Sequence, residues 1–222
     1  KIKRAFTKNT VISGSENTRP FELDCLSVYK QEPLAVVLPK NIAQIKKALE
    51  ICRKKNTPIV TRGAGTGLSG GATPLKDSVV LGLSKLTQII SIDEEKKIAV
   101  VEPGVRNLAI SEAAEEFDLY YAPDPSSQIA CTIGGNVAEH SGGVHCLKYG
   151  LTVQNVEAIK MLTIDGEELS LTRQDEGIGL LALMNGSAGL VGVVTEITGT
   201  ITPKHELAHI IQCWSGVLSA IY

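Results

Sequence analysis

Apolar residues in the first part of the chain are spaced as in a strand, a helix and two further strands. The continuous apolar run 34–38 has the length of a buried strand. Apolar residues then recur with helical spacing over 42–52, after Asn41 and Gln44, which are spaced as in a capping box. Later apolar runs predict two strands around a glycine-rich loop: 58–60 and 79–81. The first lobe is therefore predicted to run strand, helix, strand, loop, strand.

The pattern from residue 87 onward predicts a second lobe. Its predicted elements are a hairpin of Ile89–Ile92 and Ile98–Val101, a helix from Leu108 to Phe117 capped by Asn107, a hairpin of Val156–Ile164 and Glu167–Leu171 around the two-residue turn Asp165-Gly166, a short helix Leu180–Met184, and a long strand Val191–Ile201 ended by Pro203. Residues 122–150 are instead dense in Pro, Gly, Ser and Asn. We expect an α+β protein of two subdomains, 1–86 and 87–205, and an apolar tail, 206–222, that is a candidate docking helix.

Composition and charge narrow the class of protein. The 222 residues are 43% hydrophobic with a net charge of −2, and no cluster of Lys and Arg is long enough for nucleic-acid binding. No apolar run is long enough for a membrane span. The five cysteines are odd in number and form no CxxC pair, which favours reduced thiols and a cytoplasmic location. Peripheral attachment to the inner membrane stays open.

The run 61–71, Thr-Arg-Gly-Ala-Gly-Thr-Gly-Leu-Ser-Gly-Gly, is the strongest chemical signal. Its five glycines allow a backbone whose successive N–H groups form a concave nest for anionic oxygens. Gly65 to Gly70 matches G-x-G-x-x-G, but the nicotinamide-binding form of that motif needs a helix directly after it. Here residues 72–77 lead into a strand, so we expect a loop that binds a diphosphate with its own amides.

A second glycine-rich cluster lies at 123–150. It contains Pro123-Asp124-Pro125-Ser126-Ser127, Thr132-Ile133-Gly134-Gly135-Asn136-Val137-Ala138, Ser141-Gly142-Gly143 and Tyr149-Gly150. Glycine-rich segments of this length are uncommon in a compact domain without a function. Two such clusters on separate lobes predict one long ligand held between them; two unrelated turns are the alternative.

These motifs, in this order, together with Gly189-Leu190-Val191-Gly192-Val193-Val194-Thr195-Glu196, resemble one known family. The chain is similar to the FAD-binding domain of the vanillyl-alcohol oxidase/PCMH flavoproteins. Within that superfamily it resembles the D-subunit of glycolate oxidase and the FAD-linked D-lactate dehydrogenases. The resemblance runs from about Arg19 to Pro203. It implies a PCMH-type fold, with FAD held between two α+β subdomains, and oxidation of a small D-2-hydroxy acid.

The resemblance also implies a cofactor-binding set. The amides of Gly63 to Gly67 would hold the diphosphate, and the other members would line the flavin, ribityl and adenine portions. The full set is Arg62, Gly63, Ala64, Gly65, Thr66, Gly67, Leu68, Gly71, Pro103, Gly104, Asp124, Ser127, Thr132, Ile133, Gly134, Gly135, Asn136, Ala138, Ser141, Gly142, Gly143, Tyr149, Gly192, Val193 and Val194. For Arg62, contact with a phosphate or carboxylate and an ion pair within the fold both stay open. His140 and His145 are each a candidate proton carrier or a structural histidine.

The mode of FAD attachment follows from the same comparison. Some relatives bind flavin covalently through a His in the first glycine loop, where this chain has Thr66, or through a Cys, at the position of Ala130 here. We therefore expect non-covalent FAD, with Cys131 as a buried small apolar residue.

The catalytic half of the family is not matched by this chain. A substrate cap domain and a His-rich segment follow the FAD domain in the family, so no catalytic residue and no metal is assigned here. Turnover would need the cap or a partner subunit, and the electron acceptor is open. Two alternatives remain: a non-catalytic flavin-binding or interaction module, and a metal hydrolase through His205 and His209 of the H-E-x-x-H match, which lacks a third ligand in the residues after it.

Overall fold

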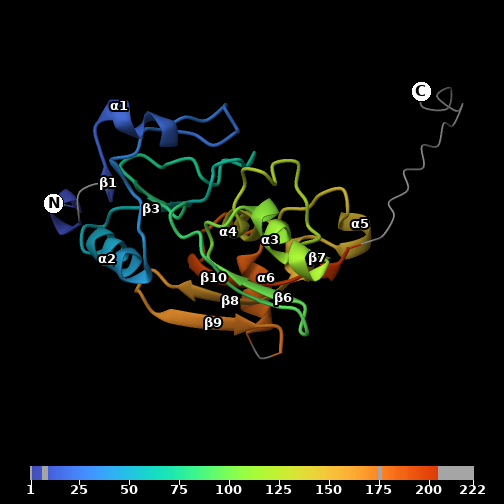
Figure 1. The fold of residues 1–222 in the computed structure, drawn as a ribbon. Helices are drawn as coiled ribbons and strands as arrows, with labels where there is room; N and C mark the ends of the chain where they lie inside the picture. Colours follow the sequence, from blue (N-terminus) through green and yellow to red (C-terminus); the bar gives the residue numbers. More distant parts are fainter. Residues whose placement is uncertain (1, 7–9, 175–176, 205–222) are drawn as a thin grey trace, which may run out of the picture.

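A computed structural model describes residues 2–6, 10–174 and 177–204, and two β-sheets organise it (Figure 1). The first sheet has the order β1-β2-β4-β3, with β1 at Val11–Ile12, β2 at Ala35–Val37, β3 at Ile59–Arg62 and β4 at Val79–Gly82. Strand β4 pairs in parallel with both β2 and β3. The short helices before β2 are η1 Ile2–Ala5, α1 Ser15–Thr18 and η2 Arg19–Phe21.

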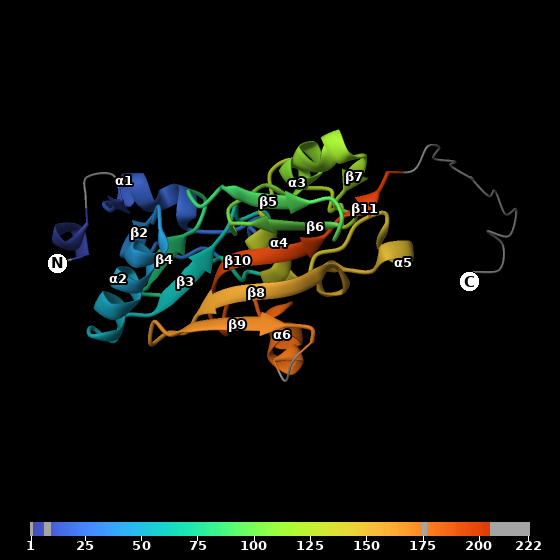
Figure 2. The ribbon, with the colours of Figure 1, turned by 60° about the horizontal axis from the view of Figure 1, so that its bottom comes forward.

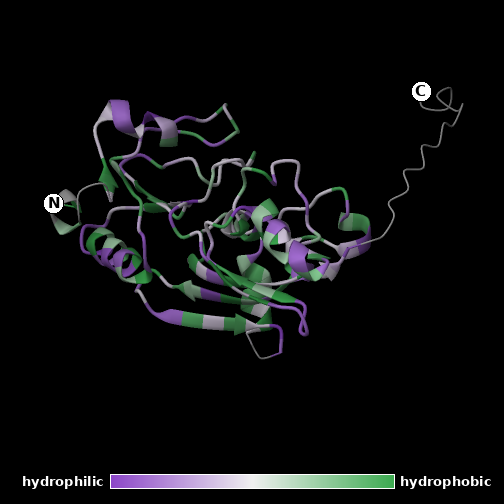
Figure 3. Cartoon of the chain, in the orientation of Figure 1, coloured by the Kyte–Doolittle hydropathy of each residue, from purple (hydrophilic) through white to green (hydrophobic). Residues whose placement is uncertain are grey.

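Helix α2 (Ile42–Arg53) forms as its spacing predicts. It buries one apolar face, made of Ile45, Ala48, Leu49 and Cys52, against an apolar cluster that includes Val37 and Leu81. Figure 3 shows the contrast between the hydrophobic and hydrophilic residues of this helix. The predicted first lobe is therefore confirmed in its order of elements.

The start of α2 is fixed by side-chain hydrogen bonds. The Asn41 carboxamide oxygen accepts from the Gln44 N–H at 3.0 Å, and the Gln44 side chain accepts from the Lys40 N–H at 2.8 Å. The second bond goes to the residue before the N-cap, so the capping box is shifted by one position.

Replacing Asn41 by Ala should lower the free energy of unfolding by about 1 kcal/mol, because the Gln44 N–H loses its acceptor. Asn41→Asp keeps an acceptor and should stay within a few tenths of a kcal/mol of the parent. Urea denaturation followed by circular dichroism measures both; equal stability of the Ala variant and the parent would contradict the capping role.

The second sheet has the order β5-β6-β10-β8-β9 and is antiparallel throughout (Figure 2). Its strands are β5 Ile89–Asp93, β6 Ile98–Val101, β8 Val156–Leu162, β9 Glu168–Thr172 and β10 Val193–Thr200. Three helices bury apolar residues in the same cluster as these strands: α3 Asn107–Ala114, α4 Ile133–Glu139 and α6 Ile178–Met184. The remaining elements are η3 Glu115–Phe117, β7 Leu119–Tyr120, α5 Cys146–Tyr149, η4 Thr152–Asn155 and β11 Thr202–Pro203.

Several sequence-based details are wrong. Asn107 does not cap α3: the N-cap is Arg106, and the Asn107 side chain donates instead to the Pro123 carbonyl at 2.9 Å and to Asn136 Oδ1 at 3.0 Å. The hairpin turn between β8 and β9 is longer than two residues. Thr163 N–H bonds the Glu167 carbonyl and Gly166 N–H bonds the Thr163 carbonyl, with Gly166 at φ +85°.

The two lobes share apolar packing. Leu162 and Val193, which end β8 and begin β10, belong to the same buried cluster as Leu49 and Leu81 of the first lobe. This packing holds the loop after β3 beside the elements of the second lobe. The boundary between residues 86 and 87 stays a prediction. In the described part of the chain, no helix combines the length and the apolar character of a membrane span.

Candidate nucleotide-binding cavity

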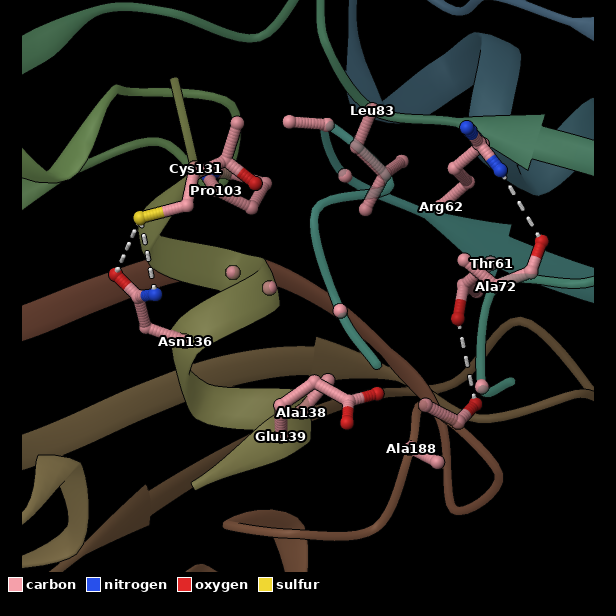
Figure 4. Close-up of a pocket in the computed structure, with 18 of the residues that line it drawn as sticks. Thr61, Arg62, Ala72, Leu83, Pro103, Cys131, Asn136, Ala138, Glu139 and Ala188 are labelled. Atoms are coloured by element: carbon pink, nitrogen blue, oxygen red, sulfur yellow. Dashed lines mark hydrogen bonds between the residues drawn. The ribbon is translucent and has the colours of Figure 1, made fainter. Parts of the chain in front are cut away.

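A cavity lies between the glycine-rich loop after β3 and helix α4 (Figure 4). It has about 910 Å³ of empty space, counted together with its open mouth. Seventeen of the residues assigned above to the cofactor line it: Arg62, Gly63, Ala64, Gly65, Thr66, Gly67, Gly71, Pro103, Ser127, Thr132, Gly134, Gly135, Asn136, Ala138, Ser141, Gly192 and Val194. The structure therefore brings both glycine clusters to one cavity.

The first wall is the loop that joins two parallel strands. It leaves β3 after Arg62, contains no helix and enters β4 at Val79, which agrees with the expectation that this is not a nicotinamide-type motif. Gly65 has φ +76°, a conformation that side chains disfavour. A Cβ at Gly65 would overlap the Arg62 guanidinium, and one at Gly63 would overlap the Thr132 hydroxyl. Glycine at these two positions therefore lets the loop backbone pack directly against the Arg62 and Thr132 side chains.

The Arg62 side chain holds this loop in place through hydrogen bonds to backbone carbonyl groups. Its side chain is largely buried, and its Nη1 donates to the carbonyl oxygens of Leu23 at 2.8 Å and Ala72 at 3.4 Å. The guanidinium also lies 5.7 Å from the centre of the Phe21 ring. Burial lowers the pKa of Arg62, while the nearby Asp24 opposes that shift. These bonds tie the segment 21–24 to both ends of the glycine loop.

Helix α4 forms the opposite wall. Thr132 precedes it, and the Thr132 hydroxyl is buried with no hydrogen-bond partner among the described residues. The Asn136 carboxamide forms hydrogen bonds within the wall. Its Oδ1 accepts from the Asn107 side chain, and its Nδ2 donates to Ser141 Oγ at 3.2 Å and to Cys131 Sγ at 3.3 Å. Cys131 is buried, as expected. The wall therefore presents helix backbone and one unsatisfied hydroxyl to the cavity.

Glu139, at the end of α4, reaches across the cavity mouth. Its carboxylate accepts a hydrogen bond from the Ser69 hydroxyl on the glycine loop. Thr61 makes a second link between the lobes by donating to the Gly189 carbonyl at 3.5 Å (Figure 4). The two walls are therefore joined at more than one point around the cavity.

Eight of the assigned residues do not line the cavity. They are Leu68, Gly104, Asp124, Ile133, Gly142, Gly143, Tyr149 and Val193. Leu68 is 71% exposed, Ile133 and Val193 are buried in apolar clusters, and Gly104 packs against the backbone of Leu83 and Leu86. The remaining four lie near α5 and the segment that precedes it.

The α5 region forms a separate polar group. Asp124 Oδ2 lies 2.8 Å from His145 Nδ1, and the rings of Tyr120, His145 and Tyr149 have centres 6.2 to 6.4 Å apart. Burial raises the pKa of Tyr120, and contact with the Tyr120 hydroxyl lowers the pKa of Tyr149. Of the two histidines that the structure describes, His145 has a carboxylate partner, and His140 is the C-cap of α4 with φ +52°.

Ten lining residues are outside the set predicted from the sequence: Asp24, Thr61, Ala72, Leu83, Cys131, Glu139, Met184, Ser187, Ala188 and Gly189. Thr61 and Gly189 belong to recognised motifs, and Ala72 and Glu139 directly follow such motifs, so the sequence could have identified them. Asp24 belongs to no motif, and only the fold brings it to the cavity. His205 and His209 of the H-E-x-x-H match, and the tail 206–222, lie outside the described residues. Among the residues that the structure describes, no group of three or more His, Cys, Asp or Glu side chains could hold a metal ion.

Comparisons with known proteins find relatives of this chain. Residues 33–172 match the family model described as FAD binding domain. The chain is 52% identical over 204 residues to the glycolate oxidase subunit GlcD of Escherichia coli K12, covering 90% of this chain and 41% of that protein. It is 40% identical to GlcD of Bacillus subtilis, covering 88% of this chain and 44% of that protein. It is 33% identical to a D-lactate dehydrogenase of Anaerostipes hadrus, covering 87% of this chain and 42% of that protein.

Solved structures agree on the fold. A structure of alkyldihydroxyacetonephosphate synthase superposes with a TM-score of 0.81 at 20% identity, over 91% of this chain and 39% of that one. Across all these matches, the chain spans less than half the length of its relatives.

Proposed function

The chain belongs to the FAD-binding domain family, its cofactor is FAD, and from this premise we propose that it is the flavin-binding part of a D-2-hydroxy acid dehydrogenase that acts on glycolate or D-lactate. The observation that carries the proposal is the single cavity that joins both glycine clusters. Relatives named glycolate oxidase subunit and D-lactate dehydrogenase support the substrate class. The proposed substrate is thus a small 2-hydroxy acid.

The residues of the cavity fit a dinucleotide with a diphosphate. Glycine at 63 and 65 lets the loop pack directly against the Thr132 hydroxyl and the Arg62 guanidinium, which leaves a loop without Cβ atoms at these positions along the cavity. The Thr132 hydroxyl, which faces Gly63 and has no hydrogen-bond partner among the described residues, is a donor that a phosphate oxygen would satisfy. We propose that Gly63 to Gly67 and Thr132 hold the diphosphate, and that the other lining residues contact the rest of FAD.

The mechanism divides between the cofactor and the chain. When bound, FAD supplies the chemistry that accepts a hydride from the substrate α-carbon. This chain would bind the cofactor with backbone donors and exclude water with the walls of the cavity. Binding through fixed backbone groups needs little rearrangement, because the loop is already held by Arg62 and α4. The group that takes the hydroxyl proton is proposed to lie in a cap domain or a partner subunit.

The same proposal includes the cellular location of the protein and its partners. The cysteines Cys25, Cys52, Cys131 and Cys146 are free thiols in the structure. Free thiols support the proposed cytoplasmic location. We further propose that a partner subunit or cap completes the enzyme and passes electrons to an acceptor.

An absorbance spectrum tests the proposal. The purified chain, loaded with FAD and freed of excess, should show flavin bands for about one FAD per chain, because the cavity between the two glycine clusters is the proposed site. Acid precipitation should release the flavin into the supernatant, because the attachment is proposed to be non-covalent. Flavin in the pellet would contradict that mode of attachment, and failure to take up any FAD would contradict the function itself.

A further inference from the structure

Asp24 lines the cavity, and the hydrogen bonds of the described residues account for only one of its two carboxylate oxygens. The residue is only 2% exposed and lines the cavity beside Arg62. Its Oδ1 accepts a hydrogen bond from the Leu26 N–H at 2.8 Å. Its Oδ2 is buried and has no hydrogen-bond partner in the described part of the chain. A buried acceptor without a partner is costly, so a second group is expected to complete it.

Arg62 does not fill that role. It is near enough to interact electrostatically with Asp24, but its Nη1 bonds go to the carbonyl oxygens of Leu23 and Ala72. The Arg62 charge therefore makes a buried carboxylate tolerable at this place without satisfying its second oxygen. A donor that enters the cavity would satisfy it.

Asp24 is fixed to the loop that the proposed function assigns to the diphosphate. The Cys25 N–H donates to the Gly67 carbonyl at 3.0 Å, and Leu26 would touch a Cβ at Gly70 at 3.7 Å. Phosphate oxygens are acceptors and carry negative charge, so a carboxylate oxygen cannot bond them. The donors next to a diphosphate are the hydroxyl groups of the sugar on either side.

We propose that Asp24 accepts a hydrogen bond from a sugar hydroxyl next to the diphosphate of FAD, on the ribose of its adenosine half or on the ribityl chain of its flavin half. This inference rests on the proposed function, because it needs FAD in the cavity. It makes Asp24 a binding residue that selects for a hydroxylated ligand, while Arg62 positions the loop around it.

The variant Asp24→Asn tests this contact, because it keeps the size of the side chain and removes its charge. Hydrogen bonds to charged groups are strong, so the dissociation constant for FAD should rise about 10- to 100-fold. Calorimetric titration of ADP and of FMN, each alone, then identifies the hydroxyl. Loss confined to FAD and ADP assigns the ribose, and loss confined to FAD and FMN assigns the ribityl chain.

A matched control is Asp77→Asn. Asp77 precedes β4, is exposed, lies outside the cavity and has φ +59°, a conformation that Asn tolerates. It should bind FAD like the parent. Thermal melting of each variant without ligand reports any structural effect.

Three results distinguish a failure of the Asp24 contact from a failure of the proposed function. If the parent chain takes up FAD and Asp24→Asn binds it equally well, the hydroxyl contact is wrong and the proposed function stands. Equal weakening of FAD, ADP and FMN, with a lower melting temperature of the ligand-free chain, would show that Asp24 acts only through Arg62 and would also overturn the contact. If the parent chain itself binds no FAD, the proposed function fails first.

Discussion

Replacing Gly65 by Val should abolish measurable FAD binding, with a loss in affinity of at least about 100-fold, or ~2.8 kcal/mol. Gly65 has φ +76°, where a β-branched residue is strained by about 1–2 kcal/mol. Its Cβ would overlap the Arg62 guanidinium, which would have to give up the Leu23 or Ala72 carbonyl. The loop could not then keep the shape that we propose for the diphosphate. Fluorescence titration with FAD measures the loss.

A suitable control carries the same backbone strain at a site far from the cavity. Gly166, in the hairpin between β8 and β9, has φ +85° and open space around it. Gly166→Val should therefore lose some stability and keep its FAD affinity. Unchanged FAD binding by the Gly65 variant would remove the glycine loop from the proposed site.

Replacing Gly104 by Ala should destabilise the chain itself, by about 1–3 kcal/mol or more. A Cβ there would lie 2.5 Å from the carbonyl oxygens of both Leu83 and Leu86, and the Gly104 N–H already donates to Leu86 at 2.8 Å. Both neighbours are backbone atoms, which cannot rotate away. The midpoint of urea unfolding, measured without FAD, should fall.

Gly179→Ala is the control for that substitution. Gly179 lies on α6, and a Cβ there would meet no described residue within 4 Å, so Ala should leave the midpoint unchanged or raise it slightly. A Gly104 variant with normal stability and lost FAD binding would instead place Gly104 in contact with the cofactor. The experiment thus distinguishes a glycine needed for packing from one needed for binding.

Local signals predicted the elements that depend on nearby residues. Helix α2 follows from its apolar spacing and from Asn41, both of which act within a few residues. Helix α4 was not predicted, because Gly134 and Gly135 are poor helix formers. It forms because Ile133 and Val137 are buried in the core of the second lobe, and tertiary packing overrides the weak local preference.

The candidate site shows the same division. The glycine clusters were visible as motifs, and the structure places most of their residues around one cavity. Asn107 looked like a helix cap, yet its carboxamide bonds Pro123 and Asn136, which are distant in sequence. Asp24 reaches the cavity only because segment 21–26 is tied to the glycine loop. Contacts of this kind depend on the finished fold, so no local pattern could have identified them.

The order of strands in the second sheet has a consequence for biosynthesis. Strand β10 is the last of that sheet to emerge from the ribosome, yet it occupies the centre and pairs with both β6 and β8. Hairpins β5–β6 and β8–β9 are local and can form early, but their inner edges stay open until Val193–Thr200 arrives. The nascent chain therefore carries two unpaired strand edges from the completion of β8 until β10 is made, which is the interval in which chaperones would be needed most.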